Sequence, residues 1–158
     1  MRTLKYVLTV SISIKFLIFF AVLVPELGLF VVSLPGSVPT HLMAPIAAIV
    51  DFIIFERKLI ASKGLVFLSL LPPVIYVIVI YILSGFGITF INNEPVPYFF
   101  LNYERLGWFR IGDGRMGVAY WIILLATVVL VLAALILWLN KRVRAQATQP
   151  NAAQEPAA

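Results

Sequence analysis

Four stretches of this chain are apolar over roughly the length that a helix needs to cross a lipid bilayer. They cover residues 6–24, 40–55, 65–83 and 118–140, with charged or turn-forming residues between them. A hydrocarbon core of about 30 Å needs about 20 apolar residues in a helix. Only helices and closed barrels satisfy the backbone in lipid. The sequence therefore predicts an all-α integral membrane bundle of four transmembrane helices within residues 1–144.

The overall composition agrees with this prediction and excludes several classes of protein. The chain is 62% hydrophobic and 12% charged, with a mean hydropathy of +1.04, whereas a soluble domain is about 45–50% apolar and about 25% charged. The absence of cysteine excludes disulfides and thiolate chemistry. With one histidine and seven carboxylates we expect no metal site, and no sequence motif indicates a cofactor.

The basic residues predict the orientation, because the cytoplasmic side of a membrane protein carries an excess of lysine and arginine. If both termini are cytoplasmic, the inner side holds Arg2, Lys5, Arg57, Lys58, Lys63, Lys141, Arg142 and Arg144. The outer side then holds only Arg105, Arg110 and Arg115. This asymmetry favours an N-in/C-in arrangement. It also explains the net charge of +5 by membrane orientation rather than by nucleic-acid binding. Residues 145–158 are rich in Ala, Gln and Pro, and we expect a disordered cytoplasmic tail.

Three polar side chains within the spans need an explanation, because charges are costly in hydrocarbon. Lys15 lies in the first span, and His41 and Asp51 lie in the second. Helix lengths place Lys15 and Asp51 within reach of each other, so we predict an intramembrane ion pair that fixes helix packing. A role in proton or ion transfer, beside the Pro72-Pro73 break of the third span, is the alternative. His41 is expected at the outer mouth of the bundle, as a solvated or capping residue or as a catalytic acid/base.

The connection over residues 84–115 is unusually aromatic for a loop, and we expect it to fold back on the bundle or to lie in the headgroup layer. One set of its side chains could line a pocket over His41: Tyr98, Asn102, Tyr103, Glu104, Arg105 and Trp108. An interfacial aromatic belt is the alternative interpretation. Four of them are the candidate substrate-binding residues: Tyr98, Asn102, Tyr103 and Trp108.

Several runs of the sequence resemble a family of bacterial multi-spanning membrane proteins. The runs are LKYVLTVSISIKFLIFFAVLVPELG, HLMAPIAAIVDFIIFE, PYFFLNY and GVAYWIILL. That family is distantly similar to the eukaryotic androgen-induced-gene membrane proteins, which hydrolyse fatty-acid esters of hydroxy fatty acids with an intramembrane threonine and a histidine. The resemblance implies a multi-pass protein of the bacterial inner membrane, with His41 matching the family histidine and a lipid as its partner.

This chain departs from the family pattern in one respect that bears on activity. Family members have about six spans, and the threonine motif lies on a helix before the first one here, so we expect a relative shortened at its N-terminus. Such a protein would be non-catalytic or weakly active. Two alternatives stay open. One is an active intramembrane lipid-ester hydrolase that uses His41, and the other is a small transporter or channel subunit that uses Lys15 and Asp51 and assembles as a homo-oligomer.

Overall fold

The structure, a computed structural model, describes residues 1–56, 59, 62–90, 93–112 and 114–148. Arg57 and Lys58, counted above among the cytoplasmic charges, lie outside the described residues. The chain divides into two compact units, residues 1–69 with 131–158 and residues 70–130. Most of the described residues are helical, as the sequence predicts.

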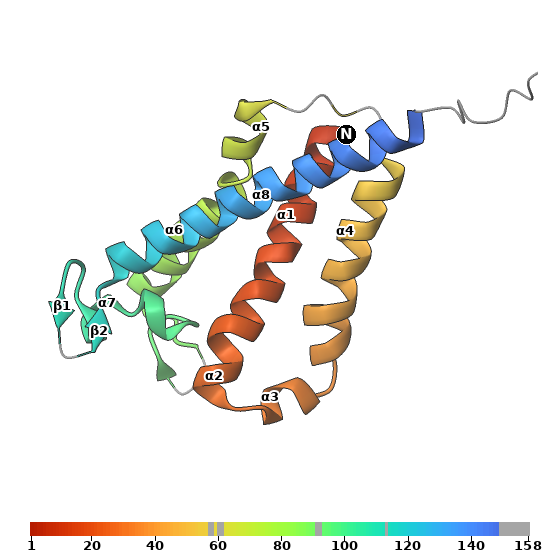
Figure 1. The fold of residues 1–158 in the computed structure, drawn as a ribbon. Coiled ribbons are helices and arrows are strands. Elements are labelled where there is room, and N and C mark those ends of the chain that lie inside the picture. Colours follow the sequence, from red (N-terminus) through yellow and green to blue (C-terminus); the bar gives the residue numbers. More distant parts are fainter. Residues whose placement is uncertain (57–58, 60–61, 91–92, 113, 149–158) are drawn as a thin grey trace, which may run out of the picture. The chain divides into compact units, whose positions relative to one another are not determined.

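The first unit contains two long antiparallel helices that lie side by side, with two short helices connecting them at one end (Figure 1). Its elements are α1 (Arg2–Ile18), the π-helical turn η1 (Phe19–Leu23), α2 (Val24–Leu27), α3 (Phe30–Ser33), the π-helical turn η2 (Pro39–Met43), α4 (Ala44–Phe55), α5 (Lys63–Leu68) and the second part of α8 (Val118–Thr148). Gly28, at φ +91°, ends α2 in a conformation that favours glycine and lets the chain turn.

The buried face of α1 forms a single stripe. Tyr6, Thr9, Val10, Ser13 and Ile14 are all buried, at the three- and four-residue spacing of one helix face. Two of the five are small hydroxyl residues, which let neighbouring backbones approach closely, as in other membrane helices. Since lipid is as apolar as these side chains, close packing rather than the hydrophobic effect holds such helices together.

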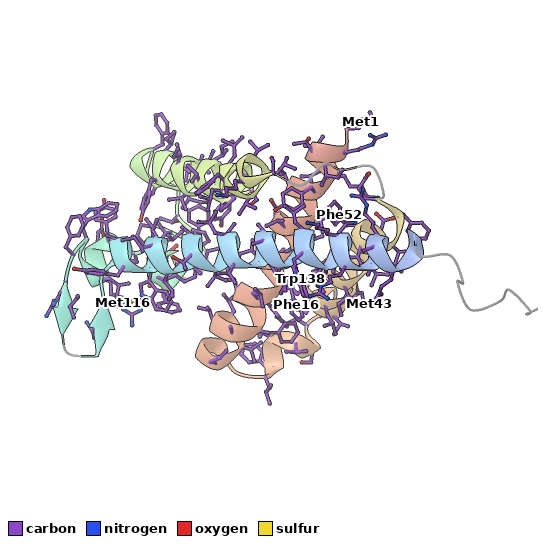
Figure 2. All side chains as sticks on the ribbon, turned by 45° about the horizontal axis from the view of Figure 1, so that its top comes forward. Met1, Phe16, Met43, Phe52, Met116 and Trp138 are labelled. Carbon is purple, nitrogen blue, oxygen red and sulfur yellow. The ribbon has the colours of Figure 1, made fainter. Side chains whose placement is uncertain are left out.

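Two polar side chains connect α1, α4 and the second part of α8. The Tyr6 hydroxyl donates a hydrogen bond to the Ala133 carbonyl at 3.0 Å, and the Tyr6 ring contacts Phe52 with 5.6 Å between ring centroids. Phe52 lies where α4 meets α1 (Figure 2). Asn140 Nδ2 donates to the Phe52 carbonyl at 3.1 Å and to the Glu56 carbonyl at 2.8 Å. Asn140 thereby binds the end of α4, where the Phe52 carbonyl also accepts from the Glu56 N–H at 3.2 Å.

The second unit consists of one long helix, an aromatic connection and the start of α8. Its elements are α6 (Leu71–Gly85), the 3₁₀ turn η4 (Phe99–Leu101), α7 (Tyr103–Leu106), the strands β1 (Ile111–Gly112) and β2 (Arg115–Met116), and the first part of α8. β1 and β2 form an antiparallel hairpin that pairs Ile111 with Met116 and Gly112 with Arg115. This hairpin is the exception to the predicted all-α fold.

Within the described residues, three helical segments are long and apolar enough to cross a membrane: Arg2–Leu23, Lys63–Gly85 and Val118–Gln146. They correspond to the first, third and fourth predicted spans. Pro39–Phe55, the predicted second span, is an apolar helix of shorter length. The protein is thus membrane-embedded by the length and composition of its helices, while the fourth crossing and the orientation stay predictions.

Two predicted boundaries differ from the structure. The third span was expected to break at Pro72-Pro73, but the break comes earlier, at Ser69–Leu70 between α5 and α6. The prolines then lie in the first turn of α6, where a helix does not need their missing N–H groups. Residues 145–148 of the predicted disordered tail are helical, because Ala and Gln readily extend a helix that already exists. The rest of that tail, residues 149–158, lies outside the described residues.

Candidate functional site

His41 lies in the π-helical turn η2 and stacks on an aromatic ring of the other π-helical turn. The centroids of the Phe19 and His41 rings are 4.1 Å apart, and their planes differ by only 8°. Inserted π turns often occur at functional sites because they change the direction in which a side chain points. Here the two turns, one at the end of α1 and one before α4, bring Phe19 and His41 face to face.

The His41 Nδ1 atom is buried and has no hydrogen-bond partner in the part of the chain that the structure describes. Buried polar atoms without a partner are rare in native proteins, and each one calls for an explanation such as a ligand. Lys15, four residues before Phe19 on α1, lies close enough to His41 for its charge to act on the imidazole. The site therefore combines one cation and one unpaired imidazole nitrogen.

The prediction that Lys15 forms an ion pair with Asp51 names the wrong lysine. Asp51 Oδ2 lies 2.7 Å from Lys5 Nζ. Because α1 and α4 are antiparallel, Asp51 near the end of α4 lies opposite the start of α1, and Lys15 is ten residues, or about 15 Å, farther along that helix. The Lys5–Asp51 pair lines a groove of about 480 Å³ between α1 and α4. The transporter alternative assumed that Lys15 and Asp51 act together, and the structure gives each a different neighbour.

The serine and threonine hydroxyls of the first span all donate to carbonyls of their own helix. Thr9 donates to the Lys5 carbonyl at 2.9 Å, Ser11 to the Val7 carbonyl at 2.8 Å and Ser13 to the Thr9 carbonyl at 2.7 Å. Thr40, beside His41 in the sequence, donates to the Gly36 carbonyl at 2.6 Å. Among the residues that the structure describes, no hydroxyl is hydrogen-bonded to His41, so no serine or threonine is in place as an activated nucleophile.

The four candidate substrate-binding residues belong to the second unit and separate into two groups. Tyr103 and Trp108 line an open cavity of about 510 Å³. Tyr98 instead stacks on Phe100, with centroids 5.2 Å apart. Asn102 is buried and acts within the loop. Its Oδ1 accepts from the Arg105 N–H at 3.1 Å, which caps α7, and its Nδ2 donates to Glu94 at 2.8 Å.

Sequence reasoning missed three residues of these sites. Lys5 was counted only as a flanking charge. Its position along α1 could have been compared with that of Lys15 as a partner for Asp51. Tyr81, which joins Tyr103 and Trp108 at the cavity, lies in the third predicted span and was not among the candidate residues. Phe19 carried no signal, because a π-helical turn has no recognisable sequence pattern. Within the described residues, no three His, Cys, Asp or Glu side chains come together as a metal site would require.

No family model, curated protein or solved structure matches the chain.

Proposed function

We propose that this protein crosses a bacterial inner membrane four times, with both termini in the cytoplasm, and that it binds a lipid carboxylate or ester at His41. In this proposal it is a relative of the membrane fatty-acid-ester hydrolases that binds their kind of ligand and hydrolyses it weakly or not at all. The observation that carries the proposal is the buried His41 Nδ1, which has no hydrogen-bond partner in the described part of the chain. The Lys15 charge acts electrostatically on the same imidazole.

The chemistry of the two side chains defines the ligand. A neutral imidazole that carries its proton on Nδ1 can donate one hydrogen bond to an ester or carboxylate oxygen. Lys15 is a cation in an apolar helix, and such charges require an anionic partner or access to the interface. A fatty-acid carboxylate satisfies both groups at once, with charge-assisted hydrogen bonds that are stronger than neutral ones. Its acyl chain would lie along exposed apolar side chains of η2 and α4, such as Met43, Ile46 and Val50.

The weak activity follows from the surroundings of His41. Ester hydrolysis by covalent catalysis needs a nucleophile within hydrogen-bond reach of its base. The hydroxyls of Thr9, Ser13 and Thr40 donate to backbone carbonyls. In this proposal His41 therefore holds the ligand oxygen without activating an attacking group.

Equilibrium binding of radiolabelled oleate to the protein in lipid nanodiscs tests the proposal. We expect saturable binding that His41→Ala weakens and that Lys15→Leu weakens about tenfold, the effect of losing one charge-assisted hydrogen bond. Lys141→Leu is the matched control, because it removes an exposed cation elsewhere, and it should leave binding unchanged. Binding that is insensitive to both His41→Ala and Lys15→Leu would contradict the proposal.

A second assay separates binding from catalysis. The protein is incubated with a fatty-acid ester of a hydroxy fatty acid, and release of free acid is followed. We expect no release above that of His41→Ala. Release that depends on His41 would instead identify an active intramembrane hydrolase, the alternative that the resemblance leaves open.

A further inference from the structure

A second candidate site lies in the unit of residues 70–130, and its side chains would attract a cation rather than an anion. Three aromatic rings at the cavity of about 510 Å³ contact one another: Tyr81 and Tyr103 with centroids 6.0 Å apart, Tyr81 and Trp108 at 5.7 Å, and Tyr103 and Trp108 at 5.7 Å. The same cavity is lined by the Glu104 carboxylate. No basic side chain lines it in the part of the chain that the structure describes.

Aromatic faces and a carboxylate together attract cations. The face of an aromatic ring is electronegative, and ammonium groups bind within about 6 Å of ring centroids, with tryptophan the best partner. Glu104 makes no hydrogen bond or salt bridge within the described residues, so its charge is available to a ligand. We propose that the cavity bounded by Tyr81, Tyr103, Glu104 and Trp108 binds a methylated ammonium group, such as that of choline.

The arrangement of the rings fixes where the cation would bind. Tyr103 and Trp108 are nearly parallel, with 16° between their planes, and they are too close to admit an ammonium group between them. The cation therefore lies against the outer faces of the cluster. The other side of this space is bounded by the end of α6 and the turn after it, including Ser84, Gly87 and Thr89. A volume of about 510 Å³ is within the usual range for small-molecule sites and larger than the ammonium group alone needs.

Hydrogen bonds within the unit fix the Tyr81 hydroxyl and the backbone of Trp108 before any ligand arrives. The Tyr81 hydroxyl donates to the Leu101 carbonyl at 2.8 Å. Trp108 follows Gly107, at φ +69°, and its carbonyl accepts from the Ala119 N–H at 3.0 Å. Because the rings are already positioned, little side-chain entropy is lost on binding.

A neutral ligand of the same shape distinguishes cation recognition from simple apolar contact. Isothermal titration of the protein in detergent with choline chloride is compared with 3,3-dimethyl-1-butanol, in which carbon replaces the charged nitrogen. We expect choline to bind at least about tenfold more tightly. Equal affinities for the two ligands would overturn the proposal.

Variants assign the binding to this cavity. Trp108→Leu should abolish choline binding, and Glu104→Gln, an exposed and conservative change, should weaken it severalfold without affecting the fold. Phe109→Leu is the matched control, because it removes a neighbouring ring that is 75% exposed and does not line the cavity. Equal loss in Phe109→Leu and Trp108→Leu, or full binding in Glu104→Gln, would overturn the assignment.

The cation can belong to a lipid headgroup or to a free solute, and the same protein distinguishes the two. Nanodiscs of phosphatidylcholine are compared with nanodiscs of phosphatidylglycerol, and choline is titrated into each. Weaker choline binding in the phosphatidylcholine discs identifies the headgroup as a ligand, and equal binding in both identifies a free solute. Two results together would refute the proposal. Choline would not bind to the protein in phosphatidylglycerol discs, and Glu104→Gln would not change how much phosphatidylcholine the protein retains.

Discussion

Asn140 is the residue whose replacement tests the packing of the first unit most sharply. Its side chain is 3% exposed, and its two amide hydrogens have carbonyl partners on α4 at Phe52, Ile53 and Glu56, at 3.1, 3.4 and 2.8 Å. Two amide hydrogens can make two good hydrogen bonds, and the shorter distances favour the Phe52 and Glu56 carbonyls as acceptors. Interhelical hydrogen bonds in membrane proteins contribute about 0.6 kcal/mol on average and at most about 1.7. We therefore expect Asn140→Leu to lower the free energy of unfolding by about 1 to 3 kcal/mol.

Reversible unfolding in mixed detergent micelles, followed by helical circular dichroism, measures this loss. Asn140→Asp keeps the shape of the side chain, but an ionised carboxylate has no hydrogen to donate and faces carbonyl oxygens, so it should destabilise the protein more than leucine does. Thr127→Val, an exposed change on the same helix, should alter stability by less than about 0.5 kcal/mol. If Asn140→Leu is as stable as the wild type, the contact between α8 and α4 is not the one described.

Three further predictions follow from single contacts. Lys5→Leu leaves Asp51 without its lysine and should destabilise the protein by up to about 1 kcal/mol in the same unfolding assay, because both side chains of the pair are partly exposed. Adding Asp51→Leu should restore stability, whereas combining Asp51→Leu with Lys15→Leu should show no such coupling. Tyr6→Phe removes the bond to Ala133 and should cost about 1 kcal/mol, measured against the harmless Tyr120→Phe. Gly117→Ala would place a Cβ 2.6 Å from the Trp108 carbonyl oxygen. Because the backbone of Trp108 must then shift, choline affinity should fall severalfold. Gly64→Ala, with its nearest contact at 3.8 Å, should leave choline affinity unchanged.

The helices were predictable because a membrane span depends on local composition alone. Three of the four predicted spans correspond to membrane-length helices, and the position of the break in the third differs by only a few residues. The end of α8 was less predictable, because Ala and Gln within residues 145–148 form helix readily, and composition alone does not say where such a helix stops.

The sites were harder to predict because they depend on which residues of different helices lie opposite each other. The choice of Lys5 over Lys15 as the partner of Asp51 is set by the antiparallel register of α1 and α4. The stacking of Phe19 on His41 depends on two π-helical turns that the sequence does not indicate. In the second unit, Tyr103 and Trp108 line a cavity, and Asn102 caps α7 through hydrogen bonds that the residue types alone did not indicate.

The most direct test of the proposed function uses the fact that His41 is the only histidine in the chain. Protein labelled with ¹⁵N-histidine gives the signals of a single imidazole, so no assignment to a residue is needed. The chemical shift of its Nδ1 reports the hydrogen bond at that atom. We predict that addition of oleate to the protein in nanodiscs moves the Nδ1 signal, that oleyl alcohol moves it less, and that Lys15→Leu reduces the response to oleate. An Nδ1 signal that stays unchanged through saturation with oleate would contradict the account of His41 as a lipid-binding residue.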